Sequence, residues 1–293
     1  DVVVLEVNPN VPRTFGDVNV PAEQVDYFIA ADYPMPEIKD PVLGERDVKI
    51  GKLIAGIVDD GDCIQLGIGS IPNAVAAALT DKKDLGVHTE MFTTGIMNLM
   101  KAGVVTGRYK QVHREKAVCS FMIGSREMYD FVDDNPAVLV LDCNYVNAPG
   151  IIARNDNQVS INTSLEVDIT GQCCSESLGS RQFSGTGGQT DTAVGAQMSR
   201  NGRSIIALYS TAMVKDPVTG ERKEASKIVT RLKEGAAVSL SRNDVNFVVT
   251  EYGMVDLKGA SIAERAKKLI SIAHPAFREQ LEREAYECGI VIR

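Results

Sequence analysis

Cys63-Ile64-Gln65-Leu66-Gly67-Ile68-Gly69-Ser70-Ile71-Pro72 is the stretch that decides the fold of this chain. Its first four residues form a short, mainly apolar run that predicts a buried strand. Gly67 and Gly69 then turn the backbone, and Pro72 suits the first position of a helix that continues through residues 74–79. Because the two glycines lack side chains, a ligand can approach the backbone N–H groups, and a helix start favours an anion there. The stretch therefore predicts a strand, a ligand-binding loop and a helix.

A second short strand is expected at residues 86–89, and it delivers Glu90 at its carboxyl end. Ligands of open α/β sheets bind at that edge, so Glu90 is a candidate site residue. A Gly-x-Gly loop followed about 20 residues later by an acid is typical of a dinucleotide site, but Pro72 replaces the usual small third residue. Alternatively, Glu90 is a nucleophile and the loop holds part of an acyl-CoA. A purely structural turn with a solvated glutamate is the third interpretation.

The composition is typical of a soluble globular protein. The 293 residues are 44% hydrophobic and 24% charged, which suits one large or two ordinary domains. We find no apolar run of about 18 residues and no signal peptide, so we expect no membrane partner. The net charge of −8, without a dense Lys/Arg block, argues against nucleic acid as a partner. The chain opens without Met inside an apparent buried strand at residues 2–7, which predicts a piece of a longer protein.

The cysteines and histidines do not predict a metal site. Among the six cysteines there is no Cys-x-x-Cys, and the adjacent Cys173 and Cys174 have poor spacing for zinc. The three histidines are scattered. Mostly buried thiols are typical of a reducing compartment, so we expect a cytoplasmic protein.

Strand-like and helix-like segments alternate along the chain. Beyond residue 90, helices are expected at 95–102, 125–133, 261–272 and 276–288, and strands at 116–123, 138–141, 204–209 and 245–250. This alternation predicts an α/β fold. Residues 159–163 and 165–169 alternate like an antiparallel pair, so we expect a mixed sheet. Prolines are dense before residue 45, which predicts a boundary there, ahead of a helix at 47–58.

A second glycine cluster, Phe183-Ser184-Gly185-Thr186-Gly187-Gly188-Gln189-Thr190-Asp191, precedes an expected helix at residues 193–198. Three glycines among four residues cost chain entropy unless the backbone needs their freedom. The cluster favours a backbone segment brought close to a ligand, where its amides stabilise a developing oxyanion. A plain surface loop is the alternative.

Four motifs, taken together and in order, resemble the acetyl-CoA hydrolase/transferase family. They are Gln65-Leu66-Gly67-Ile68-Gly69-Ser70-Ile71-Pro72, His88-Thr89-Glu90-Met91, Gln182-Phe183-Ser184-Gly185-Thr186-Gly187-Gly188-Gln189-Thr190-Asp191 and Val249-Thr250-Glu251-Tyr252-Gly253. The resemblance implies a class I CoA-transferase of two similar α/β lobes, each an open twisted sheet with flanking helices. Residues 1–45 would be the end of the first lobe and the connection, and residues 46–293 the second lobe. The rest of the first lobe would then be a partner of this chain.

The resemblance also implies roles for individual residues. Glu90 matches the catalytic nucleophile. The residues that match coenzyme A contacts are Gly67, Ile68, Gly69, Ser70, Ile71, Asn162, Gly185 and Gly188. Thr192 departs from the family, which usually has Phe at that position. Coenzyme A or acyl-CoA is a substrate in this family, and no permanently bound cofactor or metal is implied.

The implied reaction moves CoA between a short-chain acyl-CoA and a carboxylic acid of the 4-hydroxybutyrate, butyrate or acetate type. It would pass through a glutamyl-CoA thioester on Glu90. Hydrolysis of acyl-CoA is one alternative, and a non-catalytic nucleotide-binding module is another. His88 is interpreted as a core histidine or as a group that orients Glu90, and Lys227 and Arg242 as surface residues or phosphate partners. A homo-oligomer is compatible with the sequence.

Overall fold

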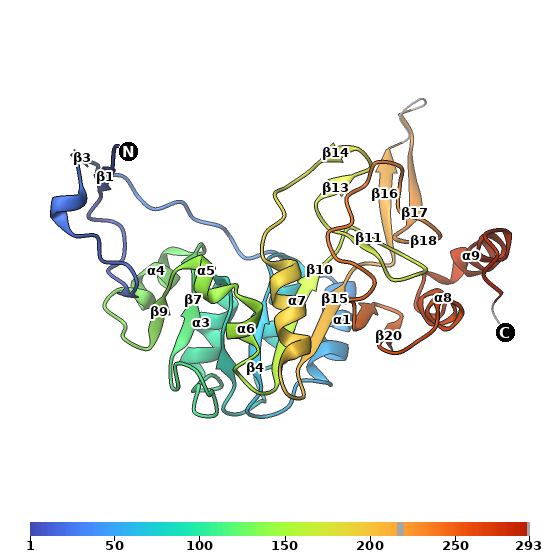
Figure 1. Ribbon diagram of the computed structural model, residues 1–293, viewed down its shortest axis with the longest axis horizontal. Coiled ribbons are helices and arrows are strands. Elements are labelled where there is room, and N and C mark those ends of the chain that lie inside the picture. The colour runs from blue at the N-terminus through green and yellow to red at the C-terminus, as the bar shows by residue number, and fades with distance from the viewer. Residues whose placement is uncertain (216–219, 292–293) are drawn as a thin grey trace.

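A six-stranded sheet forms the centre of the computed structural model, which describes residues 1–215 and 220–291 (Figure 1). Five neighbouring strands are parallel, and only the edge strand β20 is antiparallel to its neighbour. The sheet order is β20 (Gly253–Asp256), β19 (Phe247–Thr250), β15 (Arg203–Ala207), β10 (Gln158–Thr163), β4 (Cys63–Leu66) and β5 (Gly86–Val87). The predicted mixed α/β sheet is thus confirmed.

A smaller parallel sheet continues this one beyond β5. It contains β7 (Ala117–Cys119), β9 (Val138–Val140) and β2 (Phe15–Gly16). His88 forms a parallel bridge with Val118, which joins the two sheets. Helices α3 (Thr94–Lys101) and α4 (Arg126–Val132) contribute to its core, and β6 (Met91–Phe92) pairs with β8 (Phe121–Met122). The expected strand at 116–123 is therefore divided in two.

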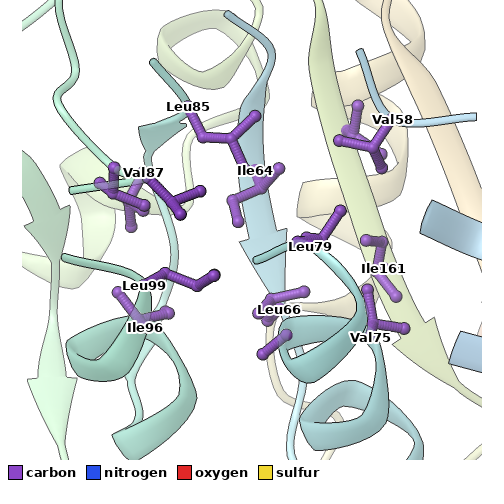
Figure 2. Packing of buried hydrophobic residues seen from close by; sticks show 14 of the residues in the cluster. Val58, Ile64, Leu66, Val75, Leu79, Leu85, Val87, Ile96, Leu99 and Ile161 are labelled. Carbon is purple, nitrogen blue, oxygen red and sulfur yellow. The ribbon is translucent and has the colours of Figure 1, made fainter. Parts of the chain in front are cut away.

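The strands of the central sheet are buried on both sides because helices cover both faces. Alternate residues point to opposite faces, so Ile205 packs in one core cluster and Ile206 in the other. The first cluster contains residues of α1 (Glu45–Ala55) and α2 (Ser70–Ala78), and Figure 2 shows its packing around Ile64 and Ile161. The second contains Ala193 of α7 (Gln189–Met198), a helix that lies in front of β10 and β15 in Figure 1 beside α6 (Pro149–Ile152).

The expected antiparallel pair at 159–163 and 165–169 is wrong. β10 lies between β4 and β15 and is parallel to both. Its alternating polar residues face the protein interior, where Ser160 Oγ donates to Gln65 Oε1 at 2.8 Å. A core strand with hydrogen-bonded polar residues thus has the same alternating pattern as a half-exposed one. β11 (Glu166–Asp168) pairs instead with β12 (Cys173–Cys174) and β18 (Ile228–Val229).

Two hairpins and two helices lie near the β19–β20 end of the main sheet. Two hairpins rise there in Figure 1, and α8 and α9 follow β20 at the C-terminal end. Their bounds are β13 (Ser177–Leu178), β14 (Arg181–Gln182), β16 (Thr211–Lys215), β17 (Arg222–Ser226), α8 (Ile262–Ser271) and α9 (Pro275–Glu287). Both C-terminal helices confirm the sequence prediction. Among the described residues, we find no helix that has the length and apolarity to cross a membrane.

The N-terminal segment extends away from the main body in Figure 1. β1 (Val4–Val7) pairs in parallel with β3 (Tyr27–Ala30), and the short helix η1 (Ala22–Gln24) lies between them. The expectation of a buried first strand is wrong for this chain, since β1 has a pairing partner along its edge but little covering its faces. The division into residues 1–45 and 46–293 stays a prediction.

Candidate active site

The candidate site lies where the parallel strands of the main sheet end. The chain runs from β4 to β5 on one side and later returns to β10 on the other side, so β4 marks a change in strand order. Such a point opens a crevice at the carboxyl edge of a sheet. The glycine loop follows β4 at this point, and Glu90 follows β5. The topology therefore brings both predicted motifs to one edge.

The glycine loop has the geometry that its sequence predicts. Gly69 adopts φ +112, a conformation that favours glycine, and is the N-cap of α2. A Cβ at Gly69 would meet nothing within 4 Å, so the backbone is open to a ligand there. The helix begins at Ser70, two residues earlier than predicted, so Pro72 is its third residue and not its first.

Glu90 is half-buried, and both its backbone oxygen and its carboxylate accept hydrogen bonds. Its backbone oxygen accepts hydrogen bonds from the N–H groups of Ser120 (2.8 Å) and Phe121 (3.2 Å). Its carboxylate oxygens have separate partners: Oε1 accepts from Asn147 Nδ2 at 3.0 Å, and Oε2 accepts from the Gly188 N–H at 3.2 Å. The carboxylate therefore has a defined orientation.

Gly188 places the start of a helix against the Glu90 carboxylate. It is the N-cap of α7, so its N–H lies at the positive end of the helix dipole. A Cβ at this position would lie 2.8 Å from Asn147 Nδ2 and 2.9 Å from Glu90 Oε2. Glycine is thus required here for close approach, although its φ of −94 suits any residue.

A cleft of about 440 Å³ opens beside Glu90. Its walls come from the second glycine cluster and from the segment around α5 (Cys143–Val146). The exposed Cys143 lies close by, since its Sγ accepts from Asn147 Nδ2 at 3.4 Å. Asp191 also lines the cleft, and burial, together with the charge of Glu90, raises the pKa of its carboxyl group. An added anion next to Glu90 is therefore electrostatically disfavoured unless donors compensate for it.

A separate cavity of about 570 Å³ borders the glycine loop. Ile68, Gly69, Ser70 and Ile71 line it, opposite residues of the β16–β17 hairpin. Its cationic groups are those of Lys215, Lys227 and Lys233. Burial lowers the pKa of Lys227, while Lys233 Nζ lies 3.9 Å from Glu166 Oε2. A mainly apolar cavity with lysines suits a long ligand that carries an anionic end.

Asn162 is buried beneath the glycine loop rather than lining either cavity wall. Its Nδ2 lies 3.3 Å from Gln65 Oε1 and 3.0 Å from Thr192 Oγ1. A Cβ at Gly67 would lie 3.3 Å from Asn162 Oδ1, so the loop packs directly on this side chain. Thr192, the departure from the family, therefore joins a polar network that links the loop to α7.

The other predicted residues line neither of these two cavities. Gly185 lies in the exposed arm of the second glycine cluster, while Thr186 and Gly187 line the Glu90 cleft. His88 is a core residue: its Nε2 lies 2.9 Å from the Val146 carbonyl oxygen, and burial lowers its pKa to about 4. Arg242 Nη2 donates to Gln172 Oε1. No cluster of metal-ligating side chains occurs within residues 1–215 and 220–291.

Sequence reasoning missed Asn147, which touches the candidate nucleophile directly. The available signal was its position, because Asn147 follows β9 in a polar segment. β9 is parallel to β7, so its carboxyl end points to the same edge as Glu90. Cys143 shares this segment, and Asp191 stood in the glycine motif without an assigned role.

Comparison with known proteins decides the family. The model of the acetyl-CoA hydrolase/transferase C-terminal domain matches residues 124–285, more than half of the chain. The chain belongs to the acetyl-CoA hydrolase/transferase family. The class I CoA-transferase fold expected from the four motifs agrees with this membership.

Relatives within the acetyl-CoA hydrolase/transferase family are similar over nearly the whole chain. The 4-hydroxybutyrate coenzyme A transferase of Clostridium kluyveri is 47% identical, covering 96% of this chain and 64% of that protein. The succinyl-CoA:cyclohexane-1-carboxylate CoA transferase of Geobacter metallireducens is 44% identical, covering 97% of this chain and 63% of that protein. The crystal structure of RipA from Yersinia pestis superposes with a TM-score of 0.91 at 39% identity, covering 99% of this chain and 64% of that one. This chain thus spans less than two thirds of each relative's length.

Proposed function

We propose that the protein of which this chain is part transfers CoA between a short-chain acyl-CoA and a carboxylic acid. The observation on which this proposal depends is the fixed carboxylate of Glu90 at the carboxyl edge of the sheet, between Asn147 Nδ2 and the Gly188 N–H. A carboxylate is a weak nucleophile in water, but alignment and partial desolvation make it effective against a thioester. The defined orientation and partial burial of Glu90 support this proposal.

The reaction proceeds by four acyl transfers. A Glu90 carboxylate oxygen attacks the thioester carbonyl carbon, which gives a mixed anhydride and releases CoA thiolate. The thiolate attacks the Glu90 carbonyl carbon, which gives a glutamyl-CoA thioester and releases the first carboxylate. The second carboxylate attacks that thioester, and CoA thiolate is released again. The thiolate then attacks the acyl carbon of the new anhydride, which gives the new acyl-CoA and restores the Glu90 carboxylate.

Asn147 and Gly188 have a direct use in these steps. In the ground state, both donate to the Glu90 carboxylate. As Glu90 becomes an acyl group, the same N–H groups lie next to the oxygen that gains charge in the tetrahedral intermediate. They therefore serve as preorganised oxyanion donors on the enzyme side of the reaction.

The cavity that borders the glycine loop takes the distal part of CoA. It contains Ile68–Ile71, which match the family's coenzyme A contacts, and three lysines that complement phosphate charge. Binding energy from this remote part offsets the strain at the reacting centre. Asn162 acts from below the loop by holding Gly67 and Gln65 in place.

The remainder of the first lobe closes the acyl side of the Glu90 cleft and is the partner of this chain within the whole protein. One support is that this chain covers only 64% and 63% of the lengths of its two curated relatives. The other is that strands β1 and β3 are poorly covered. We further propose a cytoplasmic location, because the six cysteines are free thiols. The accepted acid is of the 4-hydroxybutyrate, butyrate or acetate type, and a panel of acyl-CoA donors and acids identifies it.

Covalent capture of CoA tests this proposal. The full-length protein is incubated with an acyl-CoA without acceptor acid, digested, and analysed by mass spectrometry. We expect CoA in thioester linkage on the peptide that contains Glu90, and neither adduct nor turnover in Glu90→Gln. Glu127→Gln is the matched control, since Glu127 is an exposed glutamate paired with Lys101. Full transferase activity in Glu90→Gln would overturn the proposal.

Hydrolysis of acyl-CoA is the second candidate function. It is favoured by one observation: Glu90 is only half-buried, so water has access to an acyl group attached there. Turnover with and without added acetate separates the two activities. A transferase depends on the acid, whereas a hydrolase releases free CoA at the same rate without it.

A further inference from the structure

A chain of three hydrogen-bonding side chains connects the glycine loop to α1. Tyr209 follows β15, and its hydroxyl contacts Ser70, the first residue of α2, and Asp47 of α1. The Ser70 Oγ and Tyr209 Oη atoms are 2.7 Å apart. The tyrosine therefore links the loop to a helix that precedes it in the chain.

The protons in this chain have a fixed direction. Tyr209 has one hydroxyl proton, which it donates to the Asp47 carboxylate. The Ser70 hydroxyl must then be the donor to Tyr209 Oη. Asp47 is itself buried, and its other oxygen accepts the Gly44 N–H at 2.8 Å. Ser70 is thus the first donor, and Asp47 is the terminal acceptor.

Tyr209 is held in place independently of the loop. The guanidinium of Arg46 lies over its ring, 4.4 Å from the centroid. The adjacent Ser210 donates to both oxygens of Glu251, from its N–H at 2.9 Å and its hydroxyl at 2.8 Å. The phenol is therefore a rigid acceptor, against which the more open loop is aligned.

Ser70 occupies the position in the loop where alignment matters for a ligand. The first N–H groups of α2 have no acceptor within the helix, and they begin at Ser70. Ser70, Gly69 and Tyr209 all line the same 570 Å³ cavity. The hydrogen bond to Tyr209 fixes the rotation of this first helical residue, and with it the direction of the backbone donors.

We propose that Tyr209 is a positioning residue for acyl-CoA: through Ser70, it holds the glycine loop in its binding geometry. The proposal rests on the function proposed above, because it assigns the cavity to the CoA portion of the substrate. Tyr209 acts on substrate binding and leaves the Glu90 chemistry unchanged.

Steady-state kinetics of Tyr209→Phe in the full-length protein tests the proposal. Phenylalanine keeps the ring beneath Arg46 and removes only the hydroxyl. We expect the KM for acyl-CoA to rise roughly three- to tenfold, the effect of one lost hydrogen bond, with kcat within about twofold of the wild type. Tyr286→Phe is the matched control, because Tyr286 is a 72% exposed tyrosine of α9 that lies outside the four motifs and lines neither cavity. The control should keep the wild-type KM.

A double substitution separates positioning from a general loss of structure. If Tyr209 acts through Ser70, then Ser70→Ala raises the KM similarly, and the double variant is no worse than either single variant. Additive effects, or an unchanged KM in Tyr209→Phe, overturn the inference. Should Tyr209→Phe fail to fold, Ser70→Ala breaks the same hydrogen bond and the same KM rise is required. Absence of CoA transfer in the wild type would instead refute the proposed function.

Discussion

At the scale of single residues, Gly188 is the most sensitive position beside the candidate nucleophile. Gly188→Ala adds a Cβ that would lie 2.9 Å from Glu90 Oε2 and 2.8 Å from Asn147 Nδ2. Because φ is −94, the backbone tolerates alanine, and the strain falls on the carboxylate. We expect kcat to fall by roughly 100-fold, as for removal of one oxyanion donor, with little change in thermal stability.

Gly150→Ala is the control for that substitution, since a Cβ at Gly150 would meet nothing within 4 Å. Transferase rates and melting temperatures are compared for both variants. A Gly188→Ala protein with unchanged kcat would mean that the contact between α7 and Glu90 has no part in the reaction.

His88 should make folding sensitive to acid. Burial, assisted by the charge of Lys110, lowers its pKa in the folded protein to about 4 from an ordinary value of 6.5. Below pH 6.5, the unfolded chain binds a proton that the folded chain excludes, so stability decreases as the pH falls towards 4. Between pH 7 and pH 5, this loss amounts to about 2 kcal/mol.

Chemical denaturation at pH 7 and pH 5 measures this effect. His88→Gln has no titrating group at this position, so its stability should fall by about 2 kcal/mol less over the same interval. Equal acid sensitivity in His88→Gln and the wild type would contradict the prediction.

Some of the site could be predicted from residue patterns, and some could not. The role of Gly69 in the loop could be predicted, because the need for a positive φ depends only on neighbouring residues. Asn147 gave a weaker signal, its position after β9, because its contact with Glu90 spans 57 residues and depends on how two sheets join. Asn162 was expected to touch the ligand, which stays a prediction, and the structure packs its side chain against Gly67 of the loop. Its exact surroundings depend on Gln65 and Thr192, which no local pattern brings together.

At the scale of secondary-structure elements, α1 and α2 pack in close contact at Gly51. A Cβ there would lie 2.7 Å from the Ala74 carbonyl oxygen. Gly→Ala inside a helix ordinarily stabilises a protein by about 0.5–1 kcal/mol, but here the clash with backbone reverses the sign. We expect Gly51→Ala to destabilise the fold by about 1–3 kcal/mol.

Denaturation by urea checks this expectation, with Lys52→Ala as the control on the exposed face of α1. Because α2 begins with Ser70, separation of the two helices should also raise the KM for acyl-CoA. A stabilised Gly51→Ala protein would contradict the close packing of these helices.

Helices were easier to predict than strands for a physical reason. The amphipathic pattern of α8 is local, and a capping box between Ser261 and Glu264 marks its start. Strand partners are set by distant residues instead. The polar positions of β10 looked solvent-exposed, although buried partners satisfy them. The order of β4, β10 and β15 follows from the crossover helices and cannot be read from any one strand.

At the scale of the whole molecule, the N-terminal strands β1 and β3 present an uncovered apolar surface. Phe28 of β3 is 57% exposed, and its neighbours Tyr27 and Ile29 are exposed as well. Apolar strands open on both faces are typical of surfaces that pack against another element. This agrees with the proposal that the rest of the first lobe covers them in the whole protein.

Phe28→Ser distinguishes a covered strand from an exposed one. In the present chain, the substitution removes an exposed ring, so it should change the free energy of unfolding by less than about 0.5 kcal/mol. In the full-length protein, the same change should cost at least about 2 kcal/mol, because the ring would be lost from a packed core. Val42→Ser, at a position 97% exposed in the connection, should have little effect in either protein. Equally small effects of Phe28→Ser in both proteins would mean that this sheet stays uncovered, and that the first lobe joins the second lobe elsewhere.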